Sequence, residues 1–138
     1  MEVLVDTNVV LDWVLDRVPF NAHAEQVMAL CVSGHVSGHL AGHTLLNTFY
    51  VARKQLTVDE RREILLLLCK RFNVIAVDGP RIVSALNNKD WKDLEDGLQM
   101  QCALVEGVDY IVTRDSQGFA SSSVPTLSPE EFLKRVKV

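Results

Sequence analysis

The sequence predicts an α/β protein built on a central, mostly parallel sheet with helices on both faces. Three short apolar runs have the composition of buried strands: Val3–Val5, Val74–Val77 and Tyr110–Val112. The segments between them carry apolar residues every three or four positions, as amphipathic helices do. Because strands alternate with helices along the chain, each connection is expected to cross a face of the sheet and return a parallel strand.

The N-terminal part of the chain is expected to hold a strand, two helices and an extended segment. Val3–Val5 ends at a polar stretch that opens a helix, and Pro19 interrupts the helical pattern. Asn21 is expected to cap the next helix, which runs to about residue 33. The inward face of this helix would carry Ala24, Val27, Met28 and Cys31. Glycines between residues 34 and 42 then mark a short extended segment.

Two helices are expected in the middle of the chain, from about residue 43 to 54 and from about 58 to 71. Thr57 and Glu60 have the spacing of a capping box at the start of the second helix. The run Ile64–Cys69 in this helix is expected to be a buried face. Val74–Val77 follows as a strand, and Pro80 suits the first position of the next helix.

The C-terminal part is expected to alternate between helices and strands. Leu94–Val105 fits a helix that Gly107 closes, and Tyr110–Val112 is the next strand. Val124–Leu127 is a candidate fourth strand. The serine, proline and two glutamates at positions 128–131 provide the cap, the first-turn proline and the capping-box glutamate of a final helix.

Length and composition indicate one globular domain, residues 1–138, in the cytoplasm. Apolar residues make up 48% of the chain and charged residues 23%, as in ordinary soluble proteins. No apolar run reaches the roughly 18 residues that span a bilayer, and the N-terminus does not resemble a secretory signal, so no membrane partner is expected.

The odd number of cysteines (Cys31, Cys69, Cys102) suggests buried free thiols in a reducing compartment. A net charge of −4 excludes indiscriminate binding to nucleic acid, and the basic residues between positions 53 and 71 are interpreted as a solvated helical face.

Acidic residues are expected at the carboxyl edge of the sheet, where ligands of such sheets bind. Asp6 directly follows the apolar run Val3–Val5, and Asp115 closes the polar residues that follow Tyr110–Val112. Asp93 and Asp96 share one face of a helix, while Glu95 is expected to point elsewhere. Four converging carboxylates would suit Mg²⁺, which prefers oxygen ligands.

Each of these acids also has a purely structural explanation. Asp6 suits a helix N-cap, and Asp115 suits a turn. Acids at the start of a helix are favoured by the helix dipole, which would account for Asp93 and Asp96. Spacing alone leaves both explanations open.

Histidines offer a rival metal site. His35, His39 and His43 recur every fourth residue, which on a helix would align three imidazoles for zinc. The intervening glycines disfavour a helix, and in an extended chain residues four apart lie ~13 Å from each other. The three histidines are therefore interpreted as loop residues.

Four short motifs resemble those of PIN domains, in the order and at the spacing of that family. Residues 3–12 (VLVDTNVVLD) resemble the opening strand and turn, residues 93–99 (DLEDGLQ) the third motif, and residues 110–115 (YIVTRD) the fourth. Residues 127–133 (LSPEEFL) resemble the tail of one bacterial branch. The resemblance runs from residue 3 to about 133. It implies a PIN-like three-layer α/β/α fold, with acids gathered around Mg²⁺ or Mn²⁺.

The resemblance also assigns roles to individual residues. Asp6 and Asp96 match the family's most dependable metal ligands, Asp115 matches the ligand of the fourth motif, and Asp93 matches an accessory acid. The remaining matches are polar neighbours that orient ligands or waters: Thr7, Asn8 and Thr113.

Two positions depart from the family pattern. Asn47 stands where many PIN nucleases have a glutamate, although the branch with the PEEFL tail often has asparagine there. Gly118 stands where family members often carry an acid. Each departure removes a negative charge from the expected site.

The implied function is that of an endoribonuclease that uses Mg²⁺ or Mn²⁺ to hydrolyse phosphodiester bonds in single-stranded RNA. Many relatives are the toxins of bacterial toxin–antitoxin pairs (VapC-like), so an antitoxin protein is the expected partner. The alternative, which Asn47 and Gly118 support, is a catalytically weak or inactive PIN module that binds RNA or a protein. A homodimer is also expected, because the successive leucines after Ile64 cannot all face one core.

Overall fold

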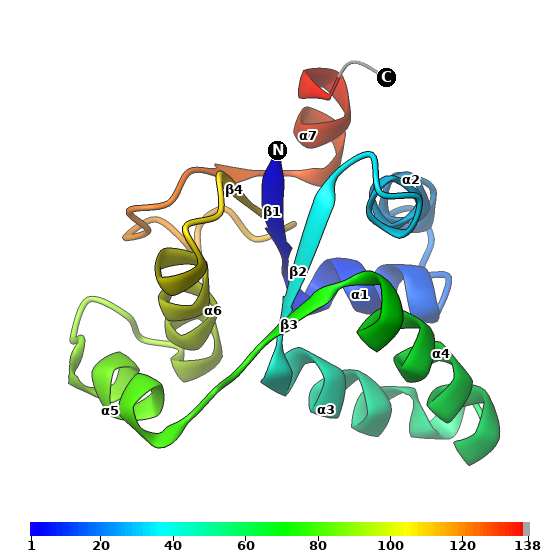
Figure 1. Cartoon of the computed structure of the whole chain (residues 1–138), viewed down its shortest axis with the longest axis horizontal. Helices are drawn as coiled ribbons and strands as arrows, with labels where there is room; N and C mark the ends of the chain where they lie inside the picture. The colour runs from blue at the N-terminus through cyan, green and yellow to red at the C-terminus, as the bar shows by residue number, and fades with distance from the viewer. Residues whose placement is uncertain (137–138) are drawn as a thin grey trace.

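The computed structural model describes residues 1–136 and has a central parallel sheet (Figure 1). The strands are β1 (Glu2–Val5), β2 (Ser37–Ala41), β3 (Asn73–Ile75), β4 (Tyr110–Val112) and β5 (Thr126–Leu127). They lie in the order β3-β2-β1-β4-β5, and every pairing is parallel. The predicted α/β class with a parallel sheet is confirmed, and β1 occupies its centre.

Helices cover both faces of the sheet, which gives the three layers. They are α1 (Thr7–Val14), α2 (Asn21–Val32), α3 (Gly42–Val51), a 3₁₀ turn (Ala52–Lys54), α4 (Val58–Arg71), α5 (Gly79–Asn87), α6 (Leu94–Glu106) and α7 (Pro129–Arg135). Side chains alternate along β1, so that Val3 and Val5 pack with α1, α2, α4 and α7, whereas Leu4 packs with α6. Figure 1 shows α5 and α6 on one side of β1 and α1, α2 and α4 on the other.

The helix boundaries follow mostly from local capping chemistry. Capping boxes begin α4, at Thr57 and Glu60, and α7, at Ser128 and Glu131, as predicted. Gly107 ends α6 in the left-handed conformation, with φ of 65°.

Asn21 does not cap α2, contrary to the prediction. It is the first residue of the helix, and its side-chain amide donates to Asp16 Oδ1 (2.8 Å). Phe20 stands at the cap position and makes no side-chain capping bond. The predicted inward face of α2, by contrast, is buried throughout: Ala24, Val27, Met28 and Cys31.

The expected burial of the run Ile64–Cys69 on α4 is wrong. Leu68 is fully buried, but Leu66 is 69% exposed and Cys69 is exposed too. The helix rests on the sheet along one stripe only, and successive residues turn away from it. Of the three cysteines, Cys31 and Cys102 are the buried ones. Among the described helices, none is both long and apolar enough to cross a membrane.

Candidate active site

The predicted acids meet where β1 and β4 end side by side. Val5 of β1 pairs with Val112 of β4, and the Asp6 amide donates to the Val112 carbonyl (3.0 Å). The chain leaves β1 toward β2 on one side, while β4 lies on the other, and such a switch point is where open parallel sheets bind ligands. Asp6 and Thr113 are thus the first residues beyond the two central strands.

Asp6 is both a helix cap and a buried acid. Its Oδ1 accepts the amide of Thr7 at the start of α1 (2.8 Å), and its Oδ2 accepts the hydroxyl of Thr113 (2.8 Å). Only 5% of Asp6 is exposed. The pKa of Asp6 is raised to about 6, chiefly by burial and to a lesser extent by the charges of Glu95 and Asp115, while the two hydrogen bonds oppose the shift.

The N-terminus of α6 supplies two more of the predicted acids. Asp93 is the N-cap, and its Oδ1 accepts the amide of Asp96 (3.0 Å). Asp96 is half-buried, and its pKa is raised to about 7, first by burial and then by the charges of Asp93, Asp6 and Asp115. The helix α6 therefore begins at one carboxylate, which caps it, and carries a second in its first turn near the sheet edge.

Asp115 reaches the same place from the loop after β4. Its amide donates to Thr113 Oγ1 (3.0 Å), and its Oδ1 accepts the amide of Gly118 (3.0 Å). A Cβ built on Gly118 would lie 2.5 Å from Asp115 Oδ2 and 2.8 Å from Asp96 Oδ2. Both carboxylates therefore gather at Gly118.

Polar neighbours hold this arrangement together. Thr113 is the central one, because its hydroxyl bonds to Asp6, to the Asp115 amide and to Asn8 Nδ2 (3.3 Å). Asn8 Oδ1 also accepts the amide of Arg114 (3.4 Å). The guanidinium of Arg114 forms a two-pronged ion pair with Asp12, a residue of α1 that is 1% exposed.

Two further residues of α6, Glu95 and Gln99, lie near the acids, and the sequence did not single out Gln99. Glu95 lines a different hollow from Asp96, yet its charge contributes to the raised pKa of both Asp6 and Asp96. Gln99 is fully buried, and its Nε2 donates to Thr7 Oγ1 (3.2 Å) and Thr44 Oγ1 (3.0 Å). Gln99 lies one helical turn beyond Glu95, on the same side of α6. This spacing is the sequence signal that could have placed Gln99 near the edge of the sheet.

Asn47 lies beside this cluster on α3. It lines a hollow of about 410 Å³ together with His43, Glu95 and Leu98. Burial lowers the pKa of His43, while the charge of Glu95 opposes that shift. A second hollow, of about 280 Å³, is lined by Asp93, Asp96 and Gly118 with Trp91 and Lys92 among its walls.

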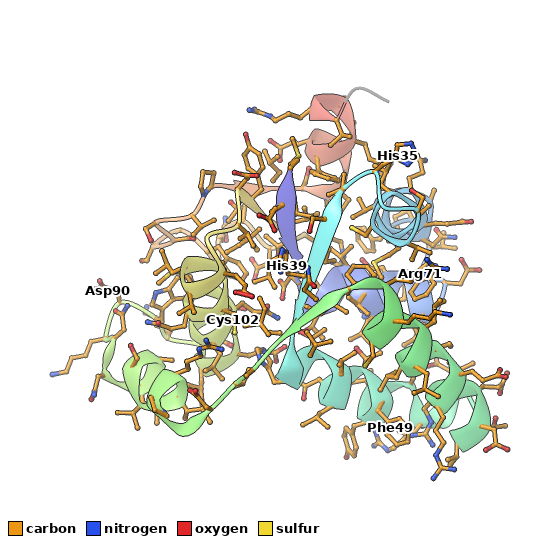
Figure 2. All side chains as sticks on the ribbon, in the orientation of Figure 1. His35, His39, Phe49, Arg71, Asp90 and Cys102 are labelled. Carbon is orange, nitrogen blue, oxygen red and sulfur yellow. The ribbon has the colours of Figure 1, made fainter. Side chains whose placement is uncertain are left out.

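The histidines do not form a shared site, and the loop assignment is wrong for two of them. His39 lies on β2, where its Nε2 bonds to Glu2 Oε1 (2.8 Å), and His43 lies on α3. His35 precedes β2 and bonds to Ser33, well apart from His39 (Figure 2).

The donor set suits a divalent cation that prefers oxygen. In the conformation of residues 1–136, no three His, Cys, Asp or Glu side chains are arranged to hold an ion. The charge of Asp115 nevertheless raises the pKa of both Asp6 and Asp96, and the charge of Asp6 raises that of Asp96. A bound cation would have the opposite effect on these carboxyls. Carboxylates alone, without cysteine or an engaged histidine, are the chemistry that Mg²⁺ and Mn²⁺ favour. The residues present fit such an ion.

Parallel sheet, helical layers and acidic edge together define a three-layer α/β/α protein with a carboxylate centre. The sequence model of the PIN domain family matches residues 2–117, and the chain belongs to this family. A comparison with curated proteins finds no significant match.

Solved structures with the same fold come from bacterial toxin–antitoxin systems. A toxin–antitoxin complex from Klebsiella pneumoniae matches with a TM-score of 0.69 and 20% identity, over 92% of this chain and 97% of that chain. VapBC-1 from nontypeable Haemophilus influenzae matches with a TM-score of 0.68 and 16% identity, over 94% of this chain and 99% of that chain. VapC20 from Mycobacterium tuberculosis is described as a toxin that cleaves the sarcin–ricin loop. It matches with a TM-score of 0.69 and 12% identity, over 86% of this chain and 94% of that chain. At these identities the likeness is one of fold.

Proposed function

We propose that the chain is a metal-dependent endoribonuclease that hydrolyses phosphodiester bonds in single-stranded RNA. The observation that carries this proposal is the gathering of Asp6, Asp96 and Asp115 at the carboxyl edge of β1 and β4. Membership of the PIN family supports nuclease chemistry in general. One protein of the same fold, VapC20, is described as a toxin that cleaves the sarcin–ricin loop.

Asp6, Asp96 and Asp115 would hold the ion, which we take to be Mg²⁺ or Mn²⁺. When bound, such an ion supplies electrophilic assistance at the phosphate and lowers the pKa of coordinated water. Thr7 and Thr113 fix both carboxylate oxygens of Asp6, so its orientation is set before any ligand arrives. This preorganisation removes an ordering cost from binding.

The other polar residues support the first three. Asn8 bonds to Thr113 and so restrains the partner of Asp6. Asp93 caps α6 and adds negative charge beside Asp96. Asn47, from α3, lines the hollow beside Glu95 and offers an uncharged amide to an RNA base or phosphate.

Gly118 supplies no carboxylate of its own, but the space beside it is not empty. The carboxylate of Asp115 occupies the space in which a side chain of residue 118 would begin. Of the two residues that support a catalytically inactive module, Gly118 thereby carries less weight, while Asn47 remains in its favour.

We further infer that the chain is the toxin of a toxin–antitoxin pair, acts in the cytoplasm and has an antitoxin protein as its partner. The support is that the similar solved structures include complexes of toxins with antitoxins. A small DNA-binding protein encoded next to this chain would be the natural candidate for the antitoxin.

Cleavage of single-stranded RNA by highly purified protein tests the proposed function. Wild type should cut with Mn²⁺ or Mg²⁺ and stop in EDTA, and Asp6→Ala should be inactive under all conditions. Asp59→Asn is the matched control, because it removes an exposed carboxylate on α4, away from β1 and β4. Full cleavage in EDTA, or wild-type activity of Asp6→Ala, would refute the proposal. Metal-independent RNA binding without cleavage would favour the non-catalytic PIN module.

A further inference from the structure

Gly118 stands beside the acidic cluster, and its backbone does not explain why it is a glycine. Among residues 1–136 the glycines with positive φ are Gly34 and Gly107, so the backbone at Gly118 is open to any L-residue. Gly118 is also half-buried rather than exposed at a loop tip. The reason for a glycine must lie in what surrounds it.

Two carboxylates surround it closely. A Cβ on Gly118 would lie 2.5 Å from Asp115 Oδ2, 3.0 Å from Asp115 Cγ and 2.8 Å from Asp96 Oδ2. Non-bonded carbon contacts are optimal at about 3.5–4.0 Å, so a methyl group cannot share this space with the carboxylates as they lie. The obstructing atoms are the ends of side chains, so a residue at 118 would move the carboxylates rather than the backbone.

Asp115 is the residue that would move first. Its carboxylate folds back over residue 118, where Oδ1 accepts the Gly118 amide (3.0 Å) while Oδ2 lies against the empty Cβ position. Two of its atoms lie within the space that a methyl group would take, whereas Asp96 contributes one.

We propose that Gly118 is a positioning residue of the acidic cluster: the missing side chain is what allows the Asp115 carboxylate to lie beside that of Asp96. A side chain without oxygen atoms at position 118, such as alanine, turns Asp115 away and leaves the cluster one oxygen ligand short. This inference rests on the proposed function for its consequence, cation binding, but the steric relation between residues 115 and 118 is independent of it.

Mn²⁺ titration calorimetry on five proteins tests the consequence. They are wild type, Gly118→Ala, Asp115→Ala, the double variant, and Gly79→Ala. Gly79 is the matched control, because it also lacks a positive φ and a Cβ there would meet no atom within 4 Å. We expect Gly118→Ala to weaken Mn²⁺ binding about tenfold or more, as loss of a ligand's positioning partner typically does. Gly79→Ala should bind like wild type.

The double variant separates positioning from a general disturbance. If Gly118 acts through Asp115, adding Gly118→Ala to Asp115→Ala weakens Mn²⁺ binding no further. Wild-type affinity in Gly118→Ala, or an equal loss in both backgrounds, would overturn the inference.

Urea unfolding in EDTA judges the steric relation without any metal. Gly118→Ala should give a lower urea midpoint, relative to its parent protein, when Asp115 is present than in the Asp115→Ala background. Equal shifts in the two backgrounds would overturn the inference. A wild type that neither binds Mn²⁺ nor cuts RNA would instead refute the proposed function, and the urea comparison would still decide the role of Gly118.

Discussion

Asp93 and Asp96 lie three residues apart on α6, yet their contributions to stability have opposite signs. Asp93 accepts the Asp96 amide as the N-cap of the helix, so its carboxylate stabilises the fold. Asp96 lies among Asp6, Asp115 and Glu95, and its pKa of about 7 shows that its ionised form is disfavoured there. The sequence pattern of paired acids does not distinguish these roles, because both residues share one helix face.

Asp96→Asn should abolish RNA cleavage and raise the melting temperature in EDTA at pH 8. The variant is nearly isosteric and removes one charge from the cluster. A half-exposed charge interaction is worth up to about 1 kcal/mol after solvent screening, so a rise of at most about 4 °C is expected. Asp93→Ala is the contrasting variant and should lower the free energy of unfolding by about 0.5–2 kcal/mol through loss of the cap. A lower melting temperature for Asp96→Asn together with intact cleavage would contradict the assignment.

The raised pKa values of Asp6 and Asp96 predict an unusual pH dependence. Both carboxyls shift from an ordinary 3.8, to about 6 and about 7 respectively, so the folded chain holds these protons more tightly than the unfolded chain. Stability in EDTA should therefore fall as pH rises from about 4 to about 7 and level off above that. Saturating Mn²⁺ should reverse the trend, because the ion needs deprotonated carboxylates.

Thermal melts across this pH range provide the measurement. Asp96→Asn should flatten the upper part of the decline seen in EDTA, since it removes the group that titrates last. A melting temperature that rises with pH in EDTA would show that folding does not disfavour the ionised forms of Asp6 and Asp96.

At the scale of elements, Gln99 ties α6 to both α1 and α3. Its amide donates to Thr7 and Thr44, whose hydroxyls also bond to each other (2.9 Å). Gln99→Met should lower the free energy of unfolding by about 1 kcal/mol, because the amide bonds are lost while the threonine pair survives. Activity should fall as well, since α6 carries Asp96.

Gln101→Met is the control on the same helix. Gln101 is only half-buried and bonds to neither threonine, so the change should stay within about 0.5 kcal/mol. Urea unfolding and initial cleavage rates measure both variants. Equal effects at the two positions would show that the buried amide has no special role.

Much of the architecture could be predicted because its signals are local. The capping boxes at Thr57 and Ser128 and the apolar runs of β1 and β4 each fix an element without knowledge of its neighbours. The convergence of Asp6 and Asp115 followed from one rule, that parallel strands end at the same edge.

The remaining features depend on packing between elements, which spacing does not encode. A helical wheel places Glu95 about 100° from Asp96, but only the approach of α3 creates the hollow that Glu95 lines with Asn47. The exposure of Leu66 depends on where α4 rests on the sheet. Asn21 is a residue type that often caps helices, but its side-chain amide donates to Asp16 in the preceding turn instead.

For the whole molecule, exposed apolar side chains on α3 and α4 lead us to expect a homodimer. Leu46, Tyr50 and Leu66 are 73%, 63% and 69% exposed, so the chain itself leaves much of these side chains uncovered. Light scattering at micromolar concentration should give about twice 15.4 kDa. Leu66→Glu should shift the equilibrium toward monomer, whereas Leu86→Glu on α5, which is 62% exposed, serves as the comparison. A wild-type species of 15.4 kDa would contradict the dimer.

The pairing of β1 with β4 also determines when the acidic cluster can form during synthesis. β1 is made before β4, and Val3 pairs with Tyr110, so the strand on this side of β1 is synthesised only after the intervening part of the chain. Until then Asp6 lacks Thr113, Asp115 and the strand that aligns them. For the proposed ribonuclease, this order delays assembly of the active site until β4 has been made and has paired with β1.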